Sequence, residues 1–246
     1  MNKEGPFVYT IRFFLLAVVA VGSIALIGLM LTSHFSMANT DTSLPVFDKN
    51  DDYTIVIDPG HGGEDAGAIA GDGTLEKDLN LEISNLLFAL CELNCTDAKL
   101  TRTEDTLLYD YYDDLESYTG QKKVYDLKNR LKITEEQENP IYVGIHMNKF
   151  SQSKYSGVQI YYSKNCDESK ELATDLRNLV KKHLQPKNNR SIKGADSSIY
   201  ILNNISSPAI LVECGFLSNE EELAQLKDKE YRAKLAVTIF ASICDF

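Results

Sequence analysis

The sequence predicts an α/β fold: a single layered domain with a mostly parallel or mixed twisted sheet flanked by helices, preceded by an N-terminal transmembrane or signal helix. Short apolar runs bounded by Gly, Pro and polar residues are typical of buried strands, and apolar residues recur at helical spacing between them. Strands that alternate with helices indicate a parallel or mixed sheet. A His or a Glu stands at the end of three of the apolar runs or on the loop directly after them, and ligands bind at the carboxyl ends of such strands.

Composition narrows the classes of function. The chain has 246 residues, of which 43% are hydrophobic, so a sizeable core is expected. Its formal net charge of -11, from 36 acidic and 25 basic residues, disfavours nucleic acid as a partner, because nucleic-acid binding depends on Lys and Arg. The five cysteines are odd in number and form no CxxC pair, so neither a disulfide framework nor a four-cysteine zinc site is indicated.

The N-terminal part predicts a membrane anchor. Residues 13–31 are apolar apart from one serine and two glycines, and about 20 such residues cross a bilayer as a helix. Lys3 and Arg12 precede this stretch, which places the N-terminus in the cytoplasm. The segment Ser36–Ala38 resembles a signal-peptidase site, so cleavage stays an alternative to an uncleaved signal anchor. Both alternatives deliver the rest of the chain outside the cytoplasm.

The sequence predicts three regions along the chain. Residues 1–33 are expected to form the signal anchor or transmembrane segment, residues 34–51 a polar linker, and residues 52–246 the folded domain. The anchor makes the membrane one expected partner of the protein.

The first half of the folded domain predicts two strands and two helices. Residues 55–57 form a buried strand that stops at Asp58-Pro59-Gly60, because proline cannot donate to a sheet and glycine permits unusual backbone angles. His61 is therefore expected on a tight loop. The remaining elements are a helix from residues 74–76 to about 94 with Glu76 in its first turn, a strand at 98–101, a loop at 107–118 and a helix around 124–133.

The second half predicts four strands and two helical regions. Residues 141–145 form a buried strand followed by His146, and residues 208–215 form another that carries Glu213 near its end. The other expected elements are strands at 157–162 and 198–202, a helix through residues 172–183, and a helical region that Asn219 caps and that continues to the C-terminus.

Four side chains at these element ends form a candidate metal site. His61, His146 and one carboxylate make a three-ligand set, which leaves a fourth tetrahedral position for water, the pattern of a catalytic zinc ion. A second carboxylate beside that water would act as its base, so Glu76 and Glu213 are both candidates. No compact motif such as HExxH is present. From the residues alone, the histidines can also be turn or core residues, and Glu76 a helix-start carboxylate favoured by the helix dipole.

Five short motifs in order resemble the zinc-dependent N-acetylmuramoyl-L-alanine amidases of bacterial cell-wall metabolism. The resemblance covers about residues 54–243, the whole folded domain. The motifs are Asp58-Pro-Gly-His61-Gly-Gly, Glu76-Lys-Asp-Leu-Asn, Leu100-Thr-Arg102-Thr-Glu-Asp105, Gly144-Ile-His146-Met-Asn148 and Pro208-Ala-Ile-Leu-Val-Glu213-Cys-Gly-Phe-Leu-Ser-Asn219.

The resemblance implies roles for the four candidate residues. His61, Glu76 and His146 would bind one Zn²⁺ ion, and Glu213 would be the catalytic acid and base. The implied enzyme is a hydrolase that cuts the amide between the lactyl group of N-acetylmuramic acid and L-alanine of the stem peptide. Peptidoglycan would then be the substrate, and residues 52–246 the catalytic domain.

Three further residues are candidates for substrate binding. Arg102 and Arg130 are expected either to contact substrate carboxylates or to pair with a neighbour such as Asp105. Asn148 is expected either to orient the site or to shape the turn after the second histidine.

Some features refine the resemblance. Gly144 and Met147 replace the Ser and Ala that are commoner around the second histidine of the family. In regulated members of the family an inserted helix blocks the zinc, whereas residues 146–213 leave no room for one, so the site is expected to be open unless a partner acts. Whether a regulatory protein partner is needed is left open.

A membrane anchor joined to a bare catalytic domain is similar to the germination-specific amidases. These enzymes prepare spore cortex for muramic-δ-lactam formation during sporulation, so the resemblance implies a place in the cell wall or the space between the forespore membranes. Two alternatives remain: a non-catalytic peptidoglycan-binding protein of the same fold, and a zinc endopeptidase that cuts within the stem peptide.

Overall fold

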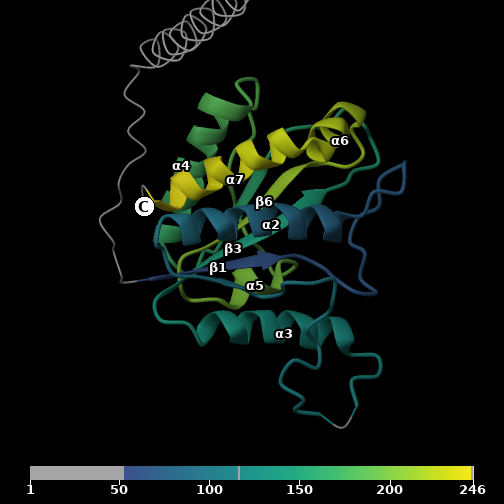
Figure 1. Cartoon of the computed structure of the whole chain (residues 1–246), viewed down its shortest axis with the longest axis vertical. Helices are drawn as coiled ribbons and strands as arrows, with labels where there is room; N and C mark the ends of the chain where they lie inside the picture. The colour runs from purple at the N-terminus through teal and green to yellow at the C-terminus, as the bar shows by residue number, and fades with distance from the viewer. Residues whose placement is uncertain (1–52, 116, 245) are drawn as a thin grey trace, which may run out of the picture. The chain divides into compact units, whose positions relative to one another are not determined.

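A six-stranded mixed sheet forms the centre of the folded domain in the computed structural model, which describes residues 53–115, 117–244 and 246 (Figure 1). The strand order is β2-β1-β3-β6-β4-β5. All neighbouring strands are parallel except β4 and β6, which are antiparallel. The strands are β1 (Thr54–Pro59), β2 (Ala98–Leu100), β3 (Pro140–Asn148), β4 (Gln159–Tyr162), β5 (Lys193–Gly194) and β6 (Ala209–Phe216). The predicted mixed α/β sheet is thus confirmed.

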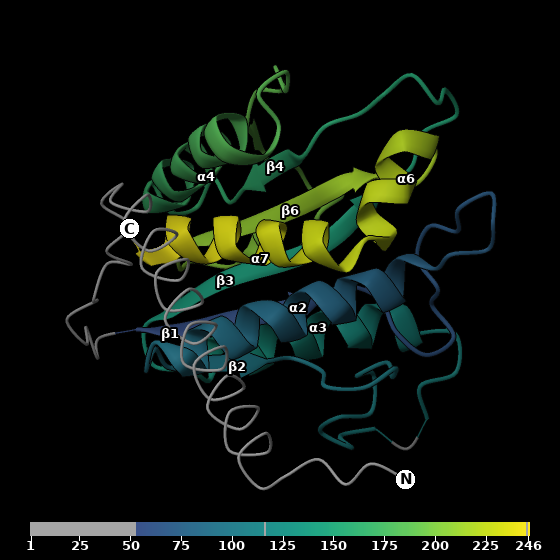
Figure 2. The same cartoon turned by 45° about the horizontal axis from the view of Figure 1, so that its top comes forward.

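Helices cover both faces of this sheet (Figure 1). One face packs against α2 (Glu76–Leu93), α4 (Glu168–Leu179) and α7 (Lys229–Cys244), which Figure 2 shows lying across the sheet. The opposite face packs against α3 (Lys122–Glu135) and the short helix α5 (Tyr200–Asn204). Two further helical segments complete the domain: η1 (Val180–Leu184), which continues α4, and α6 (Glu220–Lys227), which follows β6.

The central strands are buried because helices cover them on both sides. Ile55, Val56 and Ile57 of β1 are fully buried, and β3 and β6 carry similar apolar runs. Near-continuous apolar runs of this kind are typical of parallel strands covered on both faces. The register of β3 and β6 makes His146 and Glu213 Cα partners, so it places both side chains at the same level of the sheet.

One predicted strand is wrong: residues 198–202 enter helix α5 instead. Ile201, Leu202 and Ile205 are buried against α3 and the sheet, and the Ile205 amide donates to the Ile201 carbonyl oxygen at 2.9 Å. A five-residue apolar run is too short for its periodicity to separate a helix from a strand. The two-residue strand β5 was not expected, and the predicted helical region after Asn219 breaks at Asp228 between α6 and α7.

The N-terminal predictions fall outside the described residues. The anchor at residues 1–33 and the linker at 34–51 lie in the part of the chain that is not described. Among the helices that are described, none combines the length and the apolar character needed to cross a bilayer.

Candidate metal centre and active site

The structure brings His61, Glu76 and His146 together at the carboxyl edge of the sheet. His61 follows β1 on a turn with φ 64°, Glu76 is the first residue of α2, and His146 lies near the end of β3. The Glu76 Oε1 atom lies 3.2 Å from His61 Nε2 and 3.1 Å from His146 Nδ1. One ligand atom from each residue lies within 4.8 Å of the others. Two imidazoles and one carboxylate in this arrangement could hold a metal ion as a three-ligand set.

Neighbouring groups fix the orientation of the first histidine. The Asp65 Oδ2 atom lies 2.9 Å from His61 Nδ1, which turns Nε2 toward Glu76. A carboxylate on the outer nitrogen of a metal-binding imidazole fixes its tautomer and its ring orientation. Burial lowers the pKa of His61, but the contacts with Glu76 and Asp65 outweigh burial and raise that pKa overall. Asp65 was not among the predicted site residues, although it belongs to the same loop.

Glu76 is held by backbone donors as well as by the histidines. Its Oε2 atom accepts from the Ala68 amide at 2.7 Å, and its Oε1 atom accepts from the Met147 amide at 3.0 Å. Burial raises the pKa of Glu76, but the hydrogen bonds and charges of the two imidazoles outweigh burial and lower it well below its ordinary value. Glu76 is therefore ionised, which is the state that binds a cation.

Glu213 lies beside this cluster with an unpaired oxygen. It is the Cα partner of His146, and its Oε2 atom is buried with no hydrogen-bond partner among the described residues. An orphaned buried carboxylate oxygen is costly, so a water molecule or a substrate group is expected to satisfy it. Burial raises the pKa of Glu213 to about 7, and a carboxyl group with such a pKa can both accept and donate a proton near neutral pH.

A cleft of about 280 Å³ lies on the face of the sheet that α3 and α5 cover. His61, His146 and Glu213 are among its lining residues. Apolar side chains such as Leu127 and Ile199 line it as well. Residues 198–202, which were predicted to form a strand, line this cleft. Their place in the site was therefore not predicted.

Arg130 supports the loop that carries the first histidine. Its side chain is 2% exposed and pairs with Asp58 and, at 2.8 Å, with Asp126. Its Nη2 atom donates to the His61 carbonyl oxygen at 2.7 Å, and its Nη1 atom donates to the Pro59 carbonyl oxygen at 2.9 Å. Burial lowers the pKa of Arg130, but the charges of Asp58 and Asp126 outweigh burial and raise this pKa overall.

Arg102 also supports this loop. It is 3% exposed and donates to the carbonyl oxygens of Pro59 at 2.8 Å and Gly60 at 3.1 Å. Burial and the charge of Arg130 lower the pKa of Arg102 to about 10. These contacts favour the alternative in which Arg102 and Arg130 bond to neighbours, and direct substrate contact stays a prediction for both.

Asn148 lies at the end of β3, and its carbonyl oxygen accepts from the Leu217 amide at 2.8 Å. This contact ties the turn after His146 to the loop after β6. A role for the Asn148 side chain in substrate binding stays a prediction.

Gly60 leaves room for the imidazole of His146, so a methyl group added at position 60 is expected to displace that ring. A Cβ atom at position 60 would lie 2.2 Å from His146 Cε1 and 2.3 Å from His146 Nε2. We expect Gly60→Ala to displace the imidazole and to weaken zinc binding about 5- to 150-fold, the equivalent of 1–3 kcal/mol of overpacking. Chelator competition measures the change.

Gly71→Ala is the matched control for this substitution. A Cβ atom at position 71 would meet nothing within 4 Å, so zinc binding should stay unchanged. Equal zinc affinity in the Gly60→Ala variant and the wild type would contradict the placement of His146.

Comparison with known proteins gives a consistent result. A sequence model of the family described as N-acetylmuramoyl-L-alanine amidase matches residues 55–245. The chain is 30% identical over 219 residues to the germination-specific N-acetylmuramoyl-L-alanine amidase of Bacillus subtilis strain 168, and the match covers 87% of this chain and 88% of that protein.

Two solved structures are similar to the folded domain. The CwlD amidase of Clostridioides difficile, in complex with the GerS lipoprotein, is 41% identical with a TM-score of 0.70, and the match covers 77% of this chain and 95% of that one. The amidase AmiC2 of Nostoc punctiforme is 30% identical with a TM-score of 0.65, and the match covers 79% of this chain and 96% of that one.

Proposed function

This chain belongs to the N-acetylmuramoyl-L-alanine amidase family, and on that premise we propose that His61, Glu76 and His146 bind one catalytic zinc ion and that Glu213 is the general acid and base. The observation that carries the proposal is the His-Glu-His cluster beside a buried oxygen of Glu213 that has no hydrogen-bond partner among the described residues. Two imidazoles and one carboxylate are a donor set that suits zinc, and a catalytic zinc site keeps a fourth position open.

The substrate is proposed to be the amide between the lactyl group of N-acetylmuramic acid and L-alanine of the peptidoglycan stem peptide. When bound, zinc supplies a Lewis acid for the scissile carbonyl and lowers the pKa of the attacking water toward about 7. Glu213 takes a proton from that water and passes it to the nitrogen of the departing L-alanine, so one carboxylate serves both steps.

The surrounding residues keep this geometry fixed. Asp65 orients the His61 ring, while Arg130 and Arg102 donate to the carbonyl groups of residues 59–61. Leu127 and Ile199 line the same cleft as His61, His146 and Glu213.

The products of a digestion test the reaction. Purified peptidoglycan sacculi treated with zinc-loaded protein should release peptides that begin with L-alanine and leave muramic acid without peptide, as mass spectrometry of both products will record. Chelated protein is the control. Products cut inside the stem peptide would support the zinc endopeptidase instead, and the absence of products would support the non-catalytic binding protein.

The biological setting we propose is the spore cortex. The similarity to the germination-specific amidase of Bacillus subtilis supports a role in producing the peptide-free muramic acid from which muramic-δ-lactam forms. Such a role requires an extracytoplasmic location, in the cell wall or between the forespore membranes, either anchored through residues 1–33 or secreted. The amidase of Clostridioides difficile was solved with a lipoprotein, which supports the proposal that this chain also has a protein partner. Spores that lack the protein should contain no muramic-δ-lactam in a muropeptide analysis.

A further inference from the structure

We propose that Arg190 forms a carboxylate-binding subsite beside the catalytic centre and recognises a free carboxylate of the stem peptide. This inference rests on the proposed function, because it assumes that peptidoglycan is the substrate. It adds which part of the stem peptide Arg190 would bind. Four observations carry it: the position of Arg190, its rigid support, its lack of an acidic partner, and the pocket that it lines.

The position follows from the strand register. Strand β4 runs antiparallel to β6, and Gln159 is the Cα partner of Glu213, so both side chains lie on one face of the sheet. Arg190 Nη1 donates to Gln159 Oε1 at 3.4 Å. Because neighbouring strands lie about 4.8 Å apart, this guanidinium lies on the order of 10 Å from the Glu213 carboxylate.

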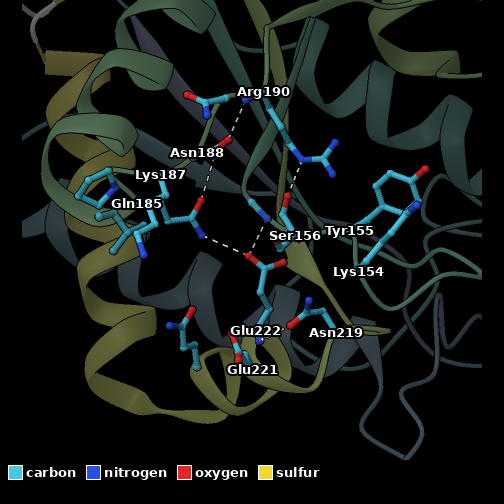
Figure 3. Close-up of a pocket in the computed structure, with 15 residues that line it drawn as sticks. Lys154, Tyr155, Ser156, Gln185, Lys187, Asn188, Arg190, Asn219, Glu221 and Glu222 are labelled. Carbon is cyan, nitrogen blue, oxygen red and sulfur yellow. Dashed lines mark hydrogen bonds between the residues drawn. The ribbon is translucent and has the colours of Figure 1, made fainter.

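The guanidinium is held in one place by its neighbours. Arg190 Nε donates to the Ser156 carbonyl oxygen at 2.7 Å, as the dashed line in Figure 3 marks. The guanidinium carbon lies 4.5 Å from the centre of the buried Phe216 ring. A guanidinium fixed in advance loses little side-chain freedom when it binds an anion.

Arg190 forms no ion pair with any carboxylate in residues 53–115 and 117–244. This differs from the behaviour of Arg130 and Arg232, which pair with acidic side chains. The two oxygens of the neighbouring Glu222 accept from the amides of Gly157 at 2.7 Å and Phe216 at 2.8 Å. Arg190 interacts electrostatically with Glu222 but makes no ion pair among the described residues, so this half-buried guanidinium keeps donors for an anionic ligand.

The pocket beside Arg190 has the chemistry of a peptide site. Its volume is about 570 Å³, and it lies between the loop after β3, the loop before β5 and the start of α6. Lys154 and Lys187 add positive charge, Glu221 and Glu222 add negative charge, and Asn188 provides an amide group (Figure 3). This combination fits a polar chain of amide bonds that carries carboxylates better than it fits the face of a sugar.

The stem peptide offers a carboxylate at a suitable distance. Its second residue is a glutamate joined through the side chain, so the α-carboxylate of that residue is free. Two extended residues span about 7 Å, and this carboxylate can therefore reach toward Arg190 while the amide of L-alanine lies beside Glu213.

A matched pair of substrates and a matched pair of variants test the subsite. The substrates are muramoyl peptides that are identical except that the α-carboxylate of the second residue is free in one and converted to a carboxamide in the other. The variants are Arg190→Gln and, as control, Arg177→Gln on α4, which removes an arginine that also forms no ion pair among the described residues. The zinc-loaded full chain is assayed for kcat and KM.

We expect the kcat/KM of the wild type and of Arg177→Gln to be about ten- to hundredfold higher for the carboxylate substrate than for the carboxamide. The difference should lie in KM, and its size is that of one hydrogen bond to a charged group. Arg190→Gln should lose this preference, because it should lower kcat/KM for the carboxylate substrate only. If Arg190 were merely structural, the variant would lower kcat/KM for both substrates equally. That result, or equal kcat/KM of the wild type for both substrates, would overturn the subsite. Hydrolysis of neither substrate by the wild type would instead contradict the proposed function, and the subsite with it.

Discussion

Replacing Glu213 with glutamine is expected to lower kcat by about 10²- to 10⁴-fold, the contribution typical of general acid–base catalysis. Glutamine keeps the size of the side chain but cannot accept the proton of the attacking water or deliver it to the leaving amine. Burial raises the pKa of the native carboxyl to about 7, so the native group can do both near neutral pH. Peptide release from sacculi measures the rate.

Zinc content separates a catalytic role of Glu213 from a structural one. Glu213 is not one of the three clustered ligands, so the Glu213→Gln variant should retain its zinc. Glu92→Gln, at an exposed position near the end of α2, is the matched control and should keep full activity. Full activity of Glu213→Gln would contradict the assignment of the acid and base, and loss of zinc would show that Glu213 is a ligand instead.

Replacing Arg130 with methionine is expected to lower the free energy of unfolding by about 3–5 kcal/mol, the typical cost of removing one partner from a buried ion pair. The substitution would leave Asp58, which is 1% exposed, without its guanidinium partner. Burial raises the pKa of Asp58, but Arg130, Thr101 and Tyr142 outweigh burial and lower it. Removing Arg130 leaves burial less opposed, so the ionised form of Asp58 becomes costly in the folded protein. Urea denaturation measures the loss.

An exposed ion pair provides the control for Arg130. Lys227 pairs with Asp72 at 2.6 Å, but their side chains are 51% and 40% exposed. Lys227→Met should therefore change the free energy of unfolding by less than about 1 kcal/mol. If Arg130→Met were as stable as Lys227→Met, Arg130 would not be supporting the loop of His61 as its contacts indicate.

The proximity of the candidate site residues could be predicted from the sequence because they stand next to strong local signals. His61 follows an apolar run and a Pro-Gly turn, His146 ends another apolar run, and Glu213 ends a third. Parallel strands bring such ends to one edge, which the structure confirms for all three. Glu76 was predicted at a helix start and is the first residue of α2.

The parts that could not be predicted depend on contacts between distant segments. The apolar residues of 198–202 fit a strand as well as a helix until α3 and the sheet are present to bury Ile201 and Leu202. The burial of Arg130 depends on Asp58, which lies 72 positions away in the chain. Arg190 gains its proposed role only from the antiparallel pairing of β4 with β6, and no local pattern in the sequence indicates that pairing.

The most direct test of the zinc site is the metal content of the purified protein. We expect about one zinc ion per chain in the wild type, as a three-ligand catalytic site implies. His146→Ala should lose it, because two ligands remain. His183→Ala, which removes an exposed histidine of η1, is the control and should retain it. A wild type that binds no zinc even when zinc is supplied, or a His146→Ala variant that binds as much as the wild type, would contradict the site.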